Sequence, residues 1–200
     1  MIKHAKTDHP VHELIPRRWS PYAFSEKPVT AEDLRSLFEA ARWAASSYNE
    51  QPWRFIVATK DRSEEFTRML SCLVEPNQEW ARHVPVLVLV ACLRKFSHNG
   101  QPNRVAEHDL GLATGNLMFE ATARGLSVHA MAGILPNQAR ELYNVPADAD
   151  VYTALAIGYA ASPDESADAK MRERDQTPRG RRPLHEIVFV EKWGQAAREF

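Results

Sequence analysis

Residues 44–55 read AASSYNEQPWRF and lie between a strongly amphipathic helical pattern and a short apolar strand pattern. A connection of this kind is usually a polar surface turn. Here small polar side chains are mixed with large aromatic rings: Ser46, Ser47, Asn49 and Gln51 stand among Trp43, Tyr48, Trp53 and Phe55. Exposing so much aromatic surface to water is unfavourable, so we expect something flat with polar edges to cover the stretch. A bound ligand and a second copy of the chain both fit that description.

The composition is that of an ordinary globular protein and fits one domain. Of its 200 residues, 44% are hydrophobic and 26% are charged, and a domain holds ~100 to 200 residues. The formal net charge is -1, so no overall field attracts nucleic acid and any anion site must be local. Cys72 and Cys92 belong to no CxxC or Cys/His cluster, so neither a zinc site nor a disulfide framework is predicted.

Residues 1–16 are predicted to form a flexible, solvated arm. His9 and His12 have a spacing that suits a metal, but Pro10 disfavours a helix that would hold both on one face. The start of the chain lacks the apolar stretch of a signal peptide, and no apolar run approaches the ~20 residues that span a bilayer. We therefore expect no metal site, no membrane segment and a cytoplasmic location.

Helical and strand patterns interleave over residues 1–200 without a linker or a repeat, which predicts a single α+β domain. Thr30 can cap a helix whose first turn carries Asp33 near the positive end of its dipole. The most hydrophobic run, residues 85–93, predicts a strand buried on both faces. The remaining expected elements are strands at 54–59, 126–131, 151–159 and 187–190, helices at 64–73, 104–124 and 137–144, a loop at 98–103 and a charged loop at 162–182.

The long helix expected at 104–124 carries small residues along part of its length. Gly111, Ala113 and Gly115 allow another element to approach its backbone closely. That element could be a second copy of the same helix. Gly125 is positioned to end the helix.

Two basic clusters from opposite ends of the chain suggest a local anion site. The first, Arg17-Arg18-Trp19-Ser20-Pro21-Tyr22, is either a surface turn or a phosphate clamp, because arginine and serine can both donate to phosphate oxygens. The second contains Arg179, Arg181 and Arg182. No GxGxxG or P-loop pattern offers another explanation for these arginines.

Other polar features are suited to the flat part of such a ligand. Ser46, Ser47 and Asn49 can bind the edges of a heterocycle, and Gly133 lets a backbone N–H approach a ring atom without an intervening side chain. A phosphorylated flat cofactor satisfies all of these features together.

Five segments, which span nearly the whole chain, carry a resemblance to a known family. They are RRWSPYAFSEKPVT (17–30), EAARWAASSYNEQPWRFIVA (39–58), DLGLATGNLMFEATARGL (109–126), ALAIGYA (154–160) and RGRRPLHEIV (179–188). In this order they resemble the nitroreductase family of FMN-dependent oxidoreductases, especially small members with an RWSPRAF-like start and a PSSxNxQPWRF-like loop. The second segment is the most specific of the five.

This resemblance implies an α+β fold with a central, mostly antiparallel sheet flanked by helices. It also implies an obligate homodimer with two FMN sites at the subunit interface. Residues 187–200 would be exchanged between the subunits, so that the strand at 187–190 pairs with the partner's sheet.

The resemblance further implies an FMN-binding set drawn from both subunits. The phosphate and the ribityl chain are expected near the two basic clusters, and the flavin ring near the polar stretch and the glycine turn. The predicted residues are Arg17, Arg18, Ser20, Tyr22, Arg179, Arg181 and Arg182 for the first part, Ser46, Ser47, Asn49 and Gln51 from the other subunit, Ala132 and Gly133 near flavin N5 and O4, and Asn116 as a weaker candidate for the polar edge.

The chain departs from the family pattern at two positions. Tyr22 stands where the family usually has an arginine, and it offers one hydrogen bond without a charge. Ala45 replaces the proline before the paired serines, which removes rigidity from the loop. Both changes predict weaker FMN binding than usual, or a phosphate held more by Arg179 and Arg182.

The implied activity is transfer of hydride from NADH or NADPH through flavin N5 to a nitroaromatic, quinone or similar flat acceptor, by a ping-pong mechanism. Because the cofactor supplies this chemistry, no acid or base is required, and we interpret His129 as a packed strand residue and Glu107 as a solvated helix residue. One alternative is a specialised member with dehalogenating or flavin-consuming activity, for which only residues 75–83 and 96–103 offer a short lid. Another is a flavin-binding dimer without turnover.

Overall fold

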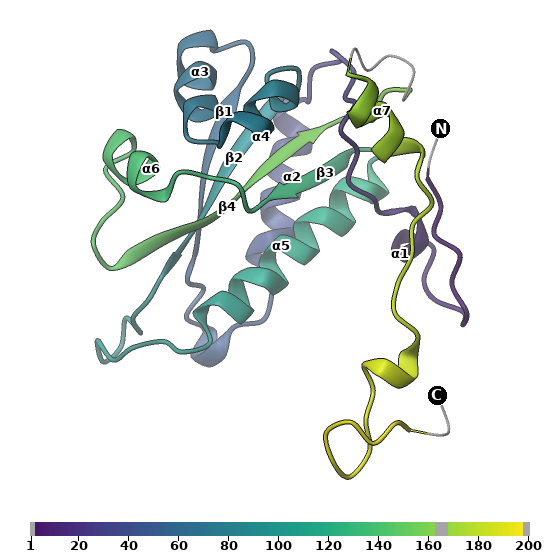
Figure 1. Cartoon of the computed structure of the whole chain (residues 1–200). Coiled ribbons are helices and arrows are strands. Elements are labelled where there is room, and N and C mark those ends of the chain that lie inside the picture. Colours follow the sequence, from purple (N-terminus) through teal and green to yellow (C-terminus); the bar gives the residue numbers. More distant parts are fainter. Residues whose placement is uncertain (1–2, 163–167, 198–200) are drawn as a thin grey trace.

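The computed structural model describes residues 3–162 and 168–197 as a sheet with helices on both sides (Figure 1). The helices are α1 (Leu14–Arg17), α2 (Ala31–Arg42), α3 (Ser63–Ser71), α4 (Glu75–Ala81), α5 (Ala106–Ala123), α6 (Pro136–Leu142) and α7 (Ala169–Gln176). The strands are β1 (Trp53–Thr59), β2 (Val86–Leu93), β3 (Ser127–Met131) and β4 (Ala149–Gly158). The expected α+β architecture is confirmed.

The four strands form one antiparallel sheet in the order β1-β2-β4-β3. Strand β2 is central, and its side chains alternate between two hydrophobic cores. Leu87, Leu89 and Ala91 belong to one core, and Val86, Val88, Val90 and Cys92 to the other. This alternation explains why the run contains no polar residue, and it confirms the prediction of a strand buried on both faces.

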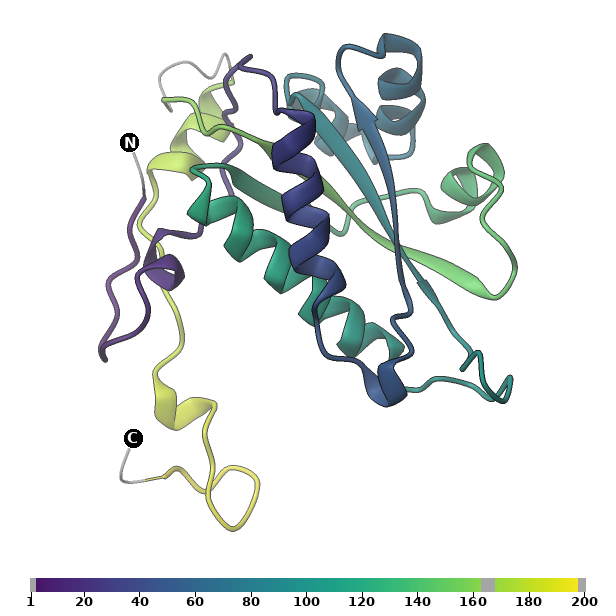
Figure 2. The same ribbon diagram turned by 180° about the vertical axis from the view of Figure 1, so that it is seen from behind.

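Helices α2 and α5 cover one face of the sheet, where they run next to each other (Figure 2). Leu37 of α2 and Leu117 of α5 are fully buried against this face. The other face is covered by α3, α4 and α6, whose contributions to the core include Met69 and Trp80. The sheet is therefore the middle of three layers.

The predicted helix boundaries have local causes that the structure confirms. The Thr30 side chain accepts a hydrogen bond from the Asp33 N–H at 3.0 Å, which satisfies a free donor in the first turn of α2. Gly125 follows α5 with a φ of 76°, a left-handed conformation that suits glycine and ends the helix. The helices expected at 64–73 and 137–144 form as α3 and α6 with shifted ends.

One prediction about local structure was wrong, and another concerns pairing with a partner that the single chain does not test. The charged segment 162–182 is not a continuous loop, because Ala169–Gln176 forms α7, which the Asp168 carboxylate caps by accepting from the N–H groups of Lys170 and Met171. Within the single chain, residues 187–190 form no strand and a backbone bridge joins Phe189 to Ala196; the pairing of 187–190 with a partner's sheet stays a prediction. Part of the expected loop, residues 163–167, lies outside the described residues, as do residues 1–2 and 198–200.

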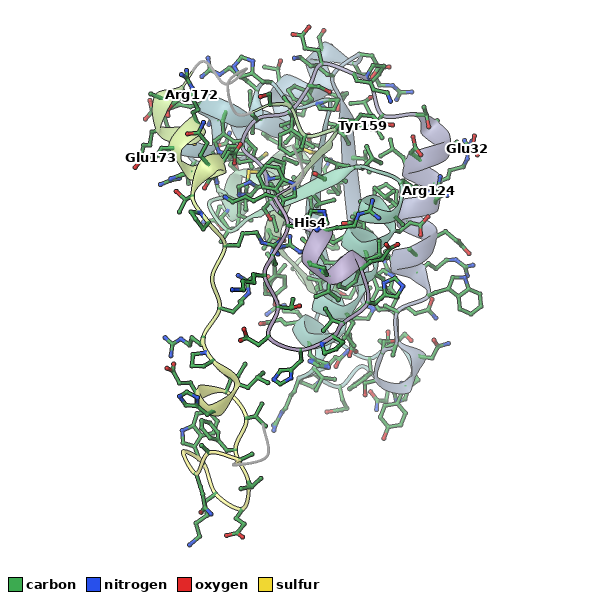
Figure 3. All side chains as sticks on the ribbon, turned by 90° about the vertical axis from the view of Figure 1, so that its right-hand side faces the viewer. His4, Glu32, Arg124, Tyr159, Arg172 and Glu173 are labelled. Atoms are coloured by element: carbon green, nitrogen blue, oxygen red, sulfur yellow. The ribbon has the colours of Figure 1, made fainter. Side chains whose placement is uncertain are left out.

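Residues 3–5 contact the last turn of α7 and the end of α1. Lys3 Nζ donates to the Arg174 carbonyl at 3.0 Å, and the Ala5 N–H donates to the Pro16 carbonyl at 2.9 Å. His4 is exposed and lies next to α1 (Figure 3). The flexibility of this arm stays a prediction.

Candidate functional site

Arg18, Ser20, Arg179 and Arg181 lie together although they come from opposite ends of the chain. Arg18 Nη1 donates to Ser20 Oγ at 3.2 Å. Burial lowers the pKa of the Arg18 guanidinium, and the charges of Arg179 and Arg181 lower it further. Three positive groups that repel one another, one of them bonded to a serine hydroxyl, favour an anion among them, because an anion reduces the repulsion. We call this group the arginine cluster.

The remaining basic residues of the predicted set have other partners. Arg17, at the end of α1, forms an ion pair at 3.7 Å with Glu13, the residue that precedes this helix. Arg182 forms one with Glu186 at 3.8 Å, and its side chain is 79% exposed. Surface pairs of this kind contribute little to stability, so both arginines can exchange their partners at small cost.

Tyr22 packs against aromatic side chains and α7. Its ring packs edge-on against Trp80 and His129, with centroids 5.2 and 4.6 Å away, and its hydroxyl accepts a hydrogen bond from Arg174 at 3.0 Å. His129 Nδ1 lies 2.8 Å from the Pro21 carbonyl oxygen. His129 is thus a packed strand residue, as expected, and the structure ties Tyr22 to α7.

The opening stretch forms a tight turn held by hydrogen bonds at both ends. The Ser47 N–H donates to the carboxylate of Asp109 in the first turn of α5 at 3.0 Å, and the Gln51 N–H donates to Ser46 Oγ at 3.0 Å. Tyr48, Asn49 and Gln51 all have φ near 50°. Such left-handed residues cost about 1–3 kcal/mol each unless the surroundings hold them, so the turn is strained and fixed by its contacts.

Glu50 joins this turn to the loop that precedes α5. Its side chain is only 5% exposed, and its carboxylate accepts hydrogen bonds from the Ser97 N–H and hydroxyl at 3.0 Å. Beside it, the rings of Tyr48, Phe96 and His98 contact one another. Because Tyr48 is 82% exposed, this aromatic group offers a large uncovered surface.

Gly133 is required by packing as well as by any ligand. A Cβ atom at this position would lie 2.6 Å from Asn77 Nδ2 and 2.7 Å from Val74 Cγ2. The Gly133 carbonyl accepts from the Val74 N–H and from Asn77 Nδ2. Within the described ranges, the N–H groups of Ala132 and Gly133 donate to no protein acceptor, which leaves two donors for a ligand.

Asn116 has a structural partner. Its Nδ2 donates to the Ala40 carbonyl at 3.1 Å and so joins α5 to α2. Glu107, the other polar residue considered on α5, is exposed and accepts a hydrogen bond from the Tyr152 hydroxyl at 2.9 Å. It behaves as the expected solvated helix residue.

The arginine cluster and the opening stretch lie near opposite ends of α5. Arg17 and Trp19 line a small cavity of about 170 Å³ together with Thr122, at the end of the helix, whereas Ser47 is bound to Asp109 at its beginning. These two positions on α5 are about 20 Å apart at 1.5 Å per residue. Figures 1 and 2 show α1 near the end of α5 and the turn that precedes β1 near its beginning. One chain therefore does not bring the two halves of the predicted site together.

Sequence reasoning missed several residues that shape these elements. Asp109 occupies the buried stripe of α5 beside Leu110 and is 3% exposed, and a carboxylate in an apolar stripe is a signal that could have been used. Asp175 and Glu50 gave no such signal, because both lie among charged or polar neighbours in the sequence.

Comparison with known proteins identifies the family. The sequence profile of the Nitroreductase family matches residues 15–159, which is more than half of the chain. The chain belongs to the nitroreductase family. It is 30% identical over 191 residues to Protein DrgA of Synechocystis sp., covering 82% of this chain and 87% of that one. It is 26% identical to the major NAD(P)H-flavin oxidoreductase of Aliivibrio fischeri, covering 91% and 99% of the two chains.

A solved structure agrees with this membership. The crystal structure of an oxidoreductase described as containing FMN superimposes on this nitroreductase family member with a TM-score of 0.89. The two chains are 33% identical, and 96% of each is covered. The predicted family and the predicted fold are therefore both confirmed.

None of the helices in residues 3–162 and 168–197 is long and apolar enough to cross a membrane. The cytoplasmic location inferred from the sequence stays a prediction.

Proposed function

We propose that the protein is an FMN-dependent NAD(P)H oxidoreductase that works as a homodimer, with FMN bound where two subunits meet. Family membership and the FMN and NAD(P)H-flavin descriptions of its relatives support the cofactor and the electron donor. The observation that supports a dimer is the separation, by about 20 Å along α5, of the arginine cluster from the stretch at residues 44–55. A second copy can bring its own stretch to the cluster of the first.

The arginine cluster fits the phosphate of FMN. Arg18, Ser20 and Arg181 are the direct candidates, because they combine positive charge with a hydroxyl donor, and Arg18 and Ser20 are partly buried. Arg179 already donates to the carbonyls of Lys3 and Pro16 at 3.1 and 2.7 Å. We therefore propose that it lines the site and contributes positive charge, without binding the phosphate directly. The two free N–H groups at Ala132 and Gly133 fit the flavin edge.

The opening stretch of the partner subunit completes this site. Ser46, Ser47, Asn49 and Gln51 would approach the flavin from there, while the exposed ring of Tyr48 is covered at the same time. The strained turn is then explained, since a fixed backbone presents these groups without a further loss of entropy on binding.

Two further features support dimerisation. A Cβ atom added at Gly111 or Gly115 would meet nothing within 4 Å, so this side of α5 is open to a second helix. Residues 184–197 extend away from the rest of the chain (Figure 1), and Trp193 is 94% exposed. We propose that this segment folds against the partner and that residues 187–190 pair with the partner's sheet.

The reaction we propose is reduction of a flat acceptor, such as a nitroaromatic or a quinone, by NADH or NADPH. FMN supplies the redox chemistry when bound. The chain's residues hold the cofactor and keep one face accessible, which the donor and the acceptor would use in turn, in ping-pong order. A lid-bearing variant of this activity is less well supported, because residues 75–81 form α4 with Trp80 buried in the core.

The colour of the purified protein tests this proposal. It should carry the absorbance of bound flavin, or take it up when incubated with FMN, and lose it without oxygen when NADH or NADPH is added. A protein that never binds FMN would refute the proposed function. A yellow protein that neither nicotinamide reduces would show that it is a flavin-binding dimer without turnover.

Sedimentation equilibrium tests the oligomeric state independently of colour. A mass near twice the 22.7 kDa of one chain is expected. A monomer that binds FMN with full affinity would contradict the shared site.

A further inference from the structure

The arginine cluster needs support from the fold, because its members do not hold themselves together. Arg18 lies near the start of the chain, and Arg179 and Arg181 lie near its end. The guanidinium groups of these residues repel one another. The backbone segments that carry them must therefore be fixed by other contacts.

Asp175, in the last turn of α7, makes the most direct of these contacts. It is 5% exposed. Both of its carboxylate oxygens accept from the Tyr22 N–H at 3.0 Å, and Oδ2 also accepts from the Ala23 N–H at 2.9 Å. Hydrogen bonds to a buried, ionised carboxylate are about twice as strong as those between neutral groups, so this contact fixes the backbone just after Ser20.

The same short segment is held from the sheet. His129 of β3 places Nδ1 2.8 Å from the Pro21 carbonyl oxygen, and burial lowers the pKa of His129. A neutral ring with its proton on Nδ1 donates to that carbonyl. The backbone from Pro21 to Ala23 thus has an acceptor on one side and a donor on the other.

A second contact joins the segment after α7 to the start of the chain, at a residue that precedes Arg18. Arg179 Nη1 donates to the Pro16 carbonyl at 2.7 Å. Residues 175 and 179 therefore bind residues 22–23 and residue 16, which stand on either side of Arg18 and Ser20. Two such contacts set the relative position of both segments.

We infer that Asp175 is a positioning residue for the phosphate of FMN. Through the backbone of Tyr22 and Ala23, it determines where Arg18 and Ser20 stand relative to Arg179 and Arg181. It need not touch the cofactor. This inference rests on the proposed function, and its consequence is specific: loss of the Asp175 carboxylate should weaken recognition of the phosphate and leave recognition of the flavin ring unchanged.

The test compares FMN with riboflavin, which has the same ring system and no phosphate. Dissociation constants of both are measured by flavin fluorescence for the wild-type protein, Asp175→Asn and Glu173→Gln. Glu173 is the matched control, because it is an exposed carboxylate on the same helix whose side chain points outward (Figure 3). In Asp175→Asn, the preference for FMN over riboflavin should fall about tenfold, which corresponds to about 1.4 kcal/mol. Riboflavin affinity and the Glu173→Gln preference should match the wild type.

Asp175→Ser is measured in parallel, because it keeps one acceptor oxygen in a smaller side chain and provides a second chance of a folded variant. Equal losses of FMN and riboflavin affinity would overturn the inference, as would an unchanged preference in both variants. If neither variant folds, Asp175 is a residue of the fold and the inference is wrong. A wild-type protein that binds neither flavin would instead refute the proposed function.

Discussion

Replacement of Gly133 by alanine should lower the stability of the protein through a steric conflict with α4. The new methyl group would lie 2.6 Å from Asn77 Nδ2 and 2.7 Å from Val74 Cγ2, whereas favourable contacts between carbon atoms begin near ~3.5 Å. Asn77 can rotate away only by giving up its hydrogen bond to the Gly133 carbonyl. Val74 is held by its own N–H, which donates to the same carbonyl.

The magnitude follows from these two contacts. A lost hydrogen bond costs about 0.5–1.5 kcal/mol, and an added methyl group in a packed place costs about 1–3 kcal/mol in total. For a chain of this size, each kcal/mol shifts the melting temperature by about 2–4 °C. We therefore expect Gly133→Ala to melt about 2–12 °C below the wild type, measured by circular dichroism at one fixed protein concentration because the midpoint of a dimer depends on concentration.

Val74→Ala provides the control, since it removes the Cγ2 atom that the new methyl group meets. In a double-mutant cycle, Gly133→Ala should cost less in the Val74→Ala background than in the wild type. Equal costs in both backgrounds, or an unchanged melting temperature in Gly133→Ala, would refute the steric explanation.

Three further predictions concern the cofactor, the interface and the pH dependence. Arg18→Ala should weaken FMN binding about 10- to 100-fold, as expected for one charge-assisted contact, without changing the sedimenting mass; unchanged affinity would place the phosphate elsewhere. Gly115→Ala should stabilise α5 on its own by about 0.5–1 kcal/mol. Because we propose that a second helix approaches α5 at this position, the added methyl group should nevertheless weaken the dimer in sedimentation. A more stable dimer would exclude this approach. Burial, with the charges of Glu107 and Asp109, raises the pKa of the Cys92 thiol to about 11. The stabilisation from this neutral thiol is complete below the unfolded pKa and is lost as pH rises toward 11, so denaturant titrations should show a smaller loss of stability between pH 9 and 11 in Cys92→Ala.

The layers of the fold were predictable because each depends on local sequence. The run at 86–93 is apolar at every position. A strand whose two faces are both apolar must be covered on both sides, so this pattern predicts a central strand. Thr30 and Gly125 mark helix ends through short-range hydrogen bonds and backbone conformation. Such signals do not depend on the rest of the molecule.

Contacts between distant segments were not predictable in the same way. The pairing of Asp175 with Tyr22 and Ala23 joins residues that share no pattern. The helix α7 was missed because its surface is almost entirely charged, so it shows no apolar period. The two basic clusters were predicted from the sequence to share an anion site, and the family resemblance supported this, but their proximity in space is visible only once both ends of the chain are placed.

The attachment of residues 175–181 to residues 16–23 also has a consequence for biosynthesis. All four strands are complete once Gly158 has been added, so the sheet can begin to form while the chain is still on the ribosome. Arg179 and Arg181 are added later, so the proposed phosphate site is completed only when the end of the chain meets residues 16–23. If the arginine cluster holds the phosphate as proposed, a chain that is cut before residue 179 would keep all of the described strands but lack Arg179 and Arg181, so it would fold as a sheet that retains FMN poorly.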